Sequence, residues 1–291
     1  MSLDIRPLSP ALGAEIVGID LREALDAESW EALASAWRTH HLLLFRGQEL
    51  DAEQQVAFCR RFGPISRQGD NMRHSRDYMH ISNTVEGGAL PNGELLFHSD
   101  HAFFASVMKA IALYAVEVPS EGGDTLYANA QLAYDNLPAA LKARIATLEA
   151  RHVYDYARKS GDQRVTIEEL GERAVQAVHP VAWPHPETGR PVLFVNEFMT
   201  HEILGLPRGE SAALLRELLG YIRDPRVIYR HAWRLKDLVV WDNRSLQHAR
   251  SNFDPREKRT LRRVPIAETG PRLVTAPGSF TERTGRDEMR D

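Results

Sequence analysis

The segment DLVVWDNRSLQHARSNFDPREKRTLRRV, residues 237–264, contains an apolar run, a lone histidine, a turn and a basic run in close succession. The run LVVW predicts a buried strand, and the polar segment after it carries His248. The turn at 254–256 then brings the chain back as a second strand, TLRRVPI. Arg259, Arg262 and Arg263 alternate there with apolar residues, so some of these arginines should point inward beside His248.

Similar short apolar runs, bounded by Gly, Pro or Asn, occupy most of the chain after residue 70. They are YMHISN, LLFHSD, KAIALYAVEV, GDTLYAN, RPVLFVN, RVIYRHAWRL, DLVVWDN and TLRRVPI. Helical spacing appears at 26–39, 51–63, 129–148 and 209–223. The pattern predicts a mainly β fold, a sandwich or barrel-like core with helical inserts. No linker divides the chain, so we expect one domain over 1–291, with a core at about 5–268 and a loose tail at 269–291.

Composition narrows the class of partner. The 291 residues are 43% hydrophobic with a formal net charge of −4, which disfavours nucleic acid and favours a small-molecule substrate. The single cysteine, Cys59, lies on the apolar stripe of the 51–63 helix and predicts core packing in a reducing compartment, the cytoplasm. Neither a signal peptide nor an apolar run long enough to span a membrane is evident, so we expect no membrane partner.

His98 and Asp100 are the first candidate metal ligands. If FHSDHAFF, residues 97–104, is a regular strand, both side chains leave the same face. Two imidazoles and a carboxylate on one face are the ligands of a mononuclear iron(II) site with open positions. On the same parity His101 should face away from the metal, as should Phe97, Ser99 and Phe103, while Ala102 and Phe104 should face it. The pair alone is weak, because composition alone would supply such pairs by chance.

A rival pair, His185 and Glu187, lies between two prolines and a glycine. We therefore interpret His185 as an exposed turn residue. His248 is the better third ligand. An inward arginine near such a site could grip the carboxylate of an organic acid that also chelates the metal, and Thr125 could donate to the same carboxylate. Gly122 and Gly123, just before Thr125, are explained as turn residues.

Taken together, these segments resemble the TauD/TfdA family of iron(II)- and 2-oxoglutarate-dependent dioxygenases. The resemblance runs from about residue 5 to 268 and rests on IRPLSPALGAEIVGIDLREAL, HLLLFRGQELDAEQQVAFCRRFGPI, FHSD, VPSEGGDTLYAN, GRPVLFVNEF and WDNRSLQHARSNFDPREKRTLRRV in that order. It implies a double-stranded β-helix, a jelly-roll, cupin-like core. The implied reaction uses O2 and 2-oxoglutarate to hydroxylate a small anionic or zwitterionic substrate, such as a sulfonate, phenoxyalkanoate, alkyl sulfate or amino acid, with release of succinate and CO2.

The resemblance also implies roles for particular residues. His98, Asp100 and His248 would bind iron, Thr125 and Arg259 would hold the distal carboxylate of 2-oxoglutarate, and Arg263 and Phe198 would contact the substrate. In the loop 66–78, Arg73 and His74 are further candidates for substrate binding, as is Arg158. Glu94 replaces an asparagine of the taurine enzymes, so taurine is not the expected substrate. The residues alone also leave open a zinc-dependent hydrolase on the same ligands, a barrel that only binds its ligand, and a homo-oligomer.

Overall fold

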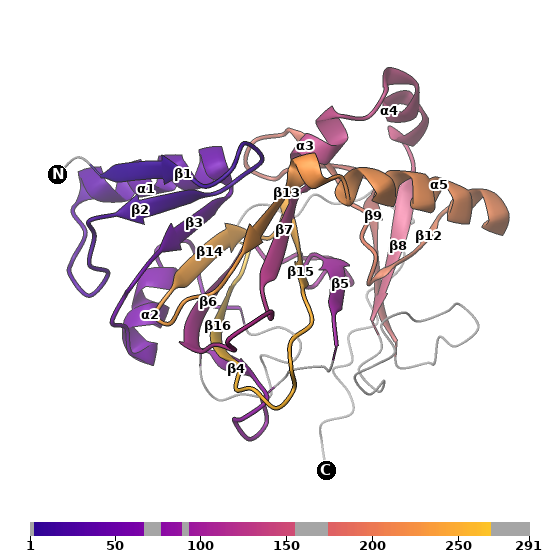
Figure 1. The fold of residues 1–291 in the computed structure, drawn as a ribbon. Coiled ribbons are helices and arrows are strands. Elements are labelled where there is room, and N and C mark those ends of the chain that lie inside the picture. Colours follow the sequence, from indigo (N-terminus) through magenta and orange to yellow (C-terminus); the bar gives the residue numbers. More distant parts are fainter. Residues whose placement is uncertain (1–2, 67–76, 89–92, 155–173, 269–291) are drawn as a thin grey trace, which may run out of the picture.

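The computed structural model describes residues 3–66, 77–88, 93–154 and 174–268, and strands dominate them. A seven-stranded sheet has the order β1 (Asp4–Pro7), β2 (Ala14–Val17), β3 (Leu42–Phe45), β14 (Leu238–Asp242), β6 (Ala110–Glu117), β16 (Thr260–Ile266) and β4 (Met79–Ser82). A four-stranded sheet has the order β13 (Ile228–His231), β7 (Thr125–Asn129), β15 (Leu246–Arg250) and β5 (Leu95–His98). Both sheets are antiparallel except between β2 and β3 (Figure 1). The expected mainly β fold is confirmed.

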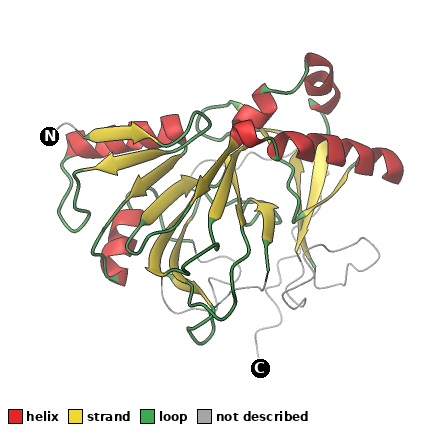
Figure 2. Cartoon of the chain, in the orientation of Figure 1, coloured by secondary structure: helices red, strands yellow, loops and turns green. Residues whose placement is uncertain are grey.

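The two N-terminal helices pack on the outer face of the seven-stranded sheet, and the later helices lie together on the other side of the molecule (Figure 2). The helices are α1 (Ala27–His40), α2 (Ala52–Cys59), α3 (Ala130–Asp135), α4 (Ala139–Ile145), α5 (Arg208–Ile222) and a 3-10 turn at Pro225–Val227. All four predicted helical regions are present, and Asp26 caps α1 by accepting a hydrogen bond from the Ser29 backbone N–H at 2.7 Å. The region 129–148 holds two helices, because Pro138 lacks a backbone N–H and stands immediately before α4.

The seven-stranded sheet is buried on both faces. In β3, Leu42 and Leu44 pack toward the four-stranded sheet, while Leu43 and Phe45 pack against α1 and α2. The strand therefore reads as a continuous apolar run rather than an alternating one. Cys59 is buried in the cluster under the helices, as predicted, and burial raises the pKa of its thiol far above the usual range.

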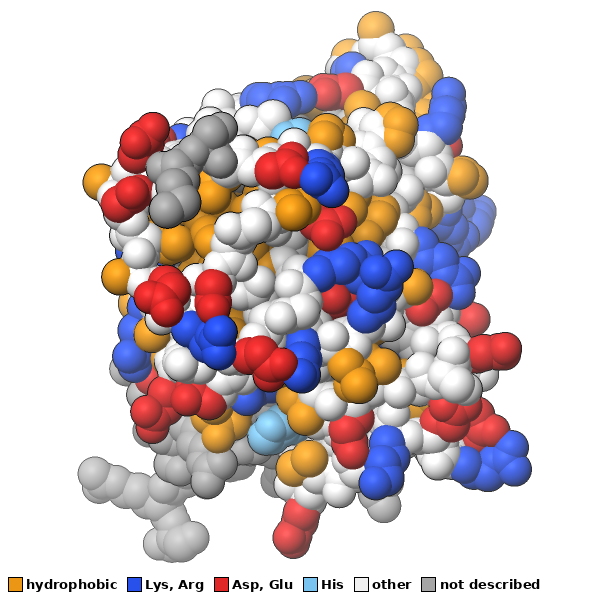
Figure 3. Space-filling view, turned by 60° about the vertical axis from the view of Figure 1, so that its left-hand side comes forward, with side chains coloured by type: hydrophobic (Ala, Val, Ile, Leu, Met, Phe, Trp, Pro, Cys, Tyr) orange, Lys and Arg blue, Asp and Glu red, His pale blue; other side chains and the backbone are white. Residues whose placement is uncertain are grey.

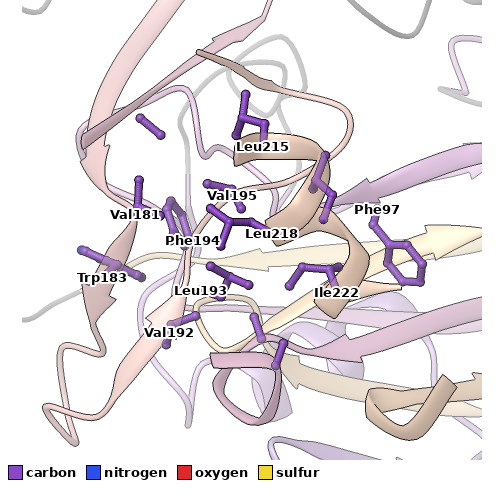
Figure 4. Packing of buried hydrophobic residues seen from close by; sticks show 14 of the residues in the cluster. Phe97, Val181, Trp183, Val192, Leu193, Phe194, Val195, Leu215, Leu218 and Ile222 are labelled. Atoms are coloured by element: carbon purple, nitrogen blue, oxygen red, sulfur yellow. The ribbon is translucent and has the colours of Figure 1, made fainter. Parts of the chain in front are cut away.

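A further layer covers the outer face of the four-stranded sheet. It contains a three-stranded sheet, β12 (Thr200–Ile203), β8 (Glu149–Tyr154) and β9 (Val175–Pro180), and a two-stranded one, β10 (Ala182–Pro184) and β11 (Pro191–Leu193). Leu215, Leu218 and Ile222 of α5 pack there against Val192 and Phe194 (Figure 4). This layer brings Tyr154 and Phe198 to the edge of the site described below.

The polar segment after β14 was not predicted as a strand of its own. It forms β15, which places His248 in the sheet beside β5. One local expectation was wrong. The strand expected over 97–104 ends at His98, and the chain then turns.

The surface carries both signs of charge. On the face shown in Figure 3, Lys and Arg side chains are interspersed with Asp and Glu, which agrees with the small net charge of −4. Among the described residues, no helix has the length and apolar character needed to cross a membrane.

Candidate metal centre

His98 and His248 lie directly opposite each other on neighbouring strands. They are register partners of β5 and β15, so both side chains leave the same face of the four-stranded sheet. Their ring centroids are 4.2 Å apart. His98 Nδ1 lies 2.8 Å from the carbonyl oxygen of Leu96. A proton on Nδ1 would donate to that oxygen and leave the lone pair of Nε2 available to a metal.

Asp100 joins them from the turn after β5. Its backbone N–H donates to Asn243 Oδ1 at 2.9 Å, and Asn243 Nδ2 donates back to the Asp100 carbonyl oxygen at 2.9 Å. This paired contact fixes the turn and brings Asp100 Oδ1 to 3.3 Å from His98 Nε2. Ligand atoms of His98, Asp100 and His248 all lie within 4.8 Å of one another, close enough to share one metal ion.

The turn changes the parity expected for the residues that follow. His101 adopts a left-handed backbone conformation, with φ of 62°, which breaks the strand alternation. His101 and Phe103 therefore line the cavity beside the ligands, although a regular strand would have turned them away. Ala102 and Phe104 instead pack into the hydrophobic cluster on the outer face of the four-stranded sheet.

Charge around the cluster favours metal-binding protonation states. Burial would raise the pKa of the Asp100 carboxyl, but the guanidinium of Arg263, whose Nη2 donates to Asp100 Oδ2 at 2.7 Å, and the nearby histidines hold that pKa well below its usual range. Burial, assisted by His98, lowers the pKa of His248 to about 3. Asp100 is thus an anion and His248 is neutral at physiological pH, as metal ligands must be.

The cluster opens into a cavity of about 210 Å³ between the two main sheets. Leu113, Trp241 and Arg263 line it from the seven-stranded sheet, and Thr125 and His248 line it from the four-stranded sheet. The remaining wall is largely apolar and aromatic and includes Phe103, Tyr154, Phe198 and Met199. Such a cavity suits a small organic ligand with few polar groups.

Arg259 is a buried cation in this cavity, 2% exposed. Its Nε and Nη2 donate to the carbonyl oxygen of Gly123 at 3.0 and 2.9 Å, whereas its Nη1 makes no hydrogen bond within the described structure. Burial and the nearby Arg250 lower the pKa of Arg259 to about 9, so the group is still charged at neutral pH. A buried guanidinium with one open donor is suited to bind a carboxylate.

Thr125 lines the same cavity and is 3% exposed. Gly122 and Gly123 just before it have φ of 73° and 65°, which confirms them as turn residues. The turn does more than reverse the chain, because it presents the Gly123 carbonyl oxygen to Arg259. Arg259 and Arg263 point into the cavity, as expected for some of the three arginines. Arg262 is also buried but points away from the cavity, where it donates to Gln55 of α2.

The other sequence candidates have different outcomes. Phe198 lines the cavity with its ring centroid 5.4 Å from that of His98. Arg73, His74 and Arg158 lie outside the described residues. The expectation for His185 was wrong: it is 3% exposed, and its Nε2 donates to Asp242 at 2.8 Å. Its Nδ1 accepts from the backbone N–H groups of the turn that follows, so the turn folds inward over the ring.

Sequence reasoning missed several residues around the site. Asn243 follows a strand and Trp233 precedes one, and neither has a spacing that marks it as functional. Arg250 could have been found, since it is register partner to Thr125 across β7 and β15 and lies two residues after His248. That signal depends on recognising β15 as a strand.

Comparison with known proteins agrees with this geometry. The model of the family "Taurine catabolism dioxygenase TauD, TfdA family" matches residues 4–264. An (S)-phenoxypropionate/alpha-ketoglutarate-dioxygenase of Sphingobium herbicidovorans is 36% identical, over 89% of this chain and 93% of that protein. The alpha-ketoglutarate-dependent 2,4-dichlorophenoxyacetate dioxygenase of Cupriavidus pinatubonensis is 35% identical, over 91% of this chain and 97% of that protein.

A solved structure gives the same picture in three dimensions. The structure of AAD-2 in complex with Mn(II) and N-oxalylglycine has a TM-score of 0.79 and 30% identity, and the match covers 94% of this chain and 100% of that one. Fold, ligand cluster and sequence similarity all agree. The chain belongs to the TauD, TfdA family of dioxygenases.

Proposed function

We propose that the cavity between the two main sheets is the active site of an alpha-ketoglutarate-dependent dioxygenase. His98, Asp100 and His248 hold iron(II), and Thr125 and Arg259 bind the distal carboxylate of 2-oxoglutarate. The observation that carries this assignment is the open, buried Nη1 of Arg259 in the same cavity as a His-Asp-His cluster. A hydrolase on the same three ligands would leave that buried donor without a partner.

The protein residues prepare the site for this chemistry. Bound iron(II), with 2-oxoglutarate and O2, supplies the oxidising power that hydroxylates a C–H bond and yields succinate and CO2. Asn243 fixes the turn that carries Asp100, and Arg263 keeps that carboxylate ionised. Phe198, against the edge of the His98 ring, keeps water from that side of the cluster.

The substrate is a small organic anion whose remaining part is apolar. Arg263 lines the cavity and is the cation nearest to Asp100, and we assign it to the anionic group of the substrate. Phe198, Phe103 and Tyr154 form the apolar wall, in which the rings of Phe103 and Tyr154 stack at 4.7 Å. Phenoxyalkanoates fit this division into anion and ring, and sulfonates, alkyl sulfates and amino acids are the classes to compare with them.

Turnover assays with defined substrates test the function. Iron(II)-loaded protein with 2-oxoglutarate and O2 should form succinate and consume at least one of these substrate classes in equal amounts. Omitting 2-oxoglutarate should abolish turnover, and so should Asp100→Ala. Glu210→Gln, on the exposed face of α5, is the matched carboxylate control and should retain full activity. Substrate turnover that does not require 2-oxoglutarate would contradict the proposal.

Three wider expectations remain proposals. Two facing antiparallel sheets with the site between them support the double-stranded β-helix, jelly-roll description. A single buried cysteine supports a reducing compartment such as the cytoplasm. The edge strand β1, most of whose residues are exposed, leaves room for a homo-oligomer, which sedimentation analysis would test.

A further inference from the structure

Trp233, just after β13, makes a specific contact with the 2-oxoglutarate side of the site. Its indole N–H donates to Thr125 Oγ1 at 3.0 Å. Thr125 is on β7, the neighbour of β13, directly opposite His231. The proposed roles of the metal ligands, Thr125 and Arg259 leave this hydrogen bond without a function.

The hydrogen bond decides where the hydroxyl proton of Thr125 can point. A threonine hydroxyl has one proton and two lone pairs, whereas an indole nitrogen can only donate. Once Trp233 has taken one lone pair, the Thr125 proton must point elsewhere. Arg259 cannot accept it either, because a guanidinium has no acceptor. Burial raises the pKa of Tyr127, and a hydrogen-bond interaction with Thr125 offsets part of that rise, but the Tyr127 hydroxyl has no partner of normal hydrogen-bond geometry within the described residues. An incoming carboxylate oxygen in the cavity is the acceptor that best satisfies the Thr125 proton.

The indole is itself held in place by a buried polar group. The ring of His231 stands perpendicular to that of Trp233, with centroids 4.5 Å apart. His231 is fully buried, 3.2 Å from the Tyr229 hydroxyl and 3.3 Å from Asp237 Oδ2. Asp237 Oδ2 in turn accepts from Arg46 Nη1 at 2.7 Å. The indole therefore has little freedom to swing away from Thr125.

We propose that Trp233 is a positioning residue for 2-oxoglutarate: its N–H orients the Thr125 hydroxyl so that the hydroxyl donates to the distal carboxylate. This inference rests on the proposed function, in which Thr125 and Arg259 bind that carboxylate. Trp233 acts on affinity through Thr125 and does not touch the ligand.

Replacement of the indole by a ring without the N–H tests the idea. Titration of 2-oxoglutarate into iron(II)-loaded protein without O2 should show a Kd about three- to tenfold higher for Trp233→Phe, as expected for loss of one oriented hydrogen bond. The Kd for iron(II) and the kcat at saturating 2-oxoglutarate should stay unchanged. Trp37→Phe is the matched control, because Trp37 is buried under α1 and its Nε1 makes no hydrogen bond within the described residues. It should leave the Kd for 2-oxoglutarate unchanged.

A double-mutant cycle with Thr125→Ala separates this inference from the proposed function. Thr125→Ala should weaken 2-oxoglutarate binding, and adding Trp233→Phe to it should have no further effect. If Thr125→Ala weakens binding while Trp233→Phe does not, the inference fails and the proposed function stands. If Thr125→Ala leaves binding intact, the assigned role of Thr125 fails and the inference fails with it.

Tyr127→Phe provides the remaining comparison. If Trp233 sets the direction of the Thr125 proton, removal of the Tyr127 hydroxyl should change the Kd for 2-oxoglutarate less than twofold. Tighter binding in Tyr127→Phe, together with wild-type binding in Trp233→Phe, would mean that Thr125 points its proton at Tyr127, and would overturn the inference.

Discussion

Two neighbouring arginines of similar burial have opposite tasks. Arg259 faces the cavity, with a hydrogen-bond donor open to a ligand, whereas Arg262 faces α2, where it donates to Gln55 and to backbone carbonyl oxygens. Arg259 immediately precedes β16 and Arg262 lies within it, and their odd spacing of three residues places their side chains on opposite faces of the sheet. The chemistry of each arginine thus follows from which face of the sheet it leaves.

A pair of variants tests this division. Arg259→Gln should raise the Kd for 2-oxoglutarate about ten- to hundredfold, since hydrogen bonds to a charged group contribute about 1.5–3 kcal/mol. Arg262→Gln should lower thermal stability, because it leaves Gln55 Oε1 and two carbonyl oxygens without their donor, but should leave that Kd unchanged. Calorimetric titration and thermal unfolding of both variants measure the two effects. Equal 2-oxoglutarate affinities for the two variants would contradict the assignment.

The sequence predicted the role of single residues best where a polar or charged side chain stood in or next to an apolar strand pattern. His98, Asp100, His248, Thr125 and Arg259 do converge on one cavity. The orientation of the His101 side chain toward the cavity and the burial of His185 could not be predicted, because each depends on the conformation of a turn. In one case a left-handed residue breaks strand parity, and in the other backbone N–H groups close over an imidazole.

Among the secondary-structure elements and their connections, the turn at Gly122 and Gly123 before β7 has a particular part in positioning the site. The turn before β7 places the Gly123 carbonyl oxygen against Arg259, and both of its glycines have left-handed backbone conformations. A Cβ at Gly123 would lie 3.0 Å from Arg259 Nε, tighter than an ordinary contact. The turn is therefore matched to the arginine that it holds.

Alanine at this turn should impair function as well as folding. Gly123→Ala should lower the free energy of unfolding by about 1–2 kcal/mol through backbone strain and should weaken 2-oxoglutarate binding by displacing Arg259. Gly189→Ala, at φ of 67° with open space around its Cβ, should show the strain alone. Denaturant unfolding and ligand titration of both variants distinguish the two. Wild-type 2-oxoglutarate affinity in Gly123→Ala would show that the turn does not position Arg259.

At this scale, prediction from sequence worked for strongly patterned elements. The apolar runs of β6 and β14 and the periodic helices α1 and α5 were all expected. β15 was missed because Gln247, His248 and Arg250 carry no apolar alternation, and its place in the sheet comes from pairing with β5 and β7. Such a strand is defined by its neighbours, which are distant in sequence.

Several histidines in different parts of the molecule are buried, and burial favours the neutral form of their imidazole rings. Burial lowers the pKa of His41 and of His179 from 6.5 to about 4, and that of His152 well below 6.5. As the pH falls below about 6.5, the unfolded chain takes up protons at these residues and the folded chain does not.

Stability should therefore fall with pH before the carboxylates titrate. We expect the melting temperature to decrease between about pH 6.5 and pH 4.5, where each such histidine withdraws at most about 1.4 kcal/mol per pH unit. Thermal unfolding of the metal-free protein across this range measures the effect. A melting temperature that stays constant down to pH 4.5 would show that these histidines are protonated in the folded state.

The metal centre depends on single residues, on secondary-structure elements and on the whole molecule. It needs particular ligands, two paired strands with a fixed turn, and two sheets that close around it. The most direct measurement is the amount of iron(II) bound per chain, followed by 2-oxoglutarate titration without O2. Wild-type protein and His40→Ala, a histidine at the end of α1, should bind one equivalent of iron(II) and then 2-oxoglutarate. Combined His98→Ala and Asp100→Ala should lose both. Full iron occupancy in that double variant would contradict the assignment of the site.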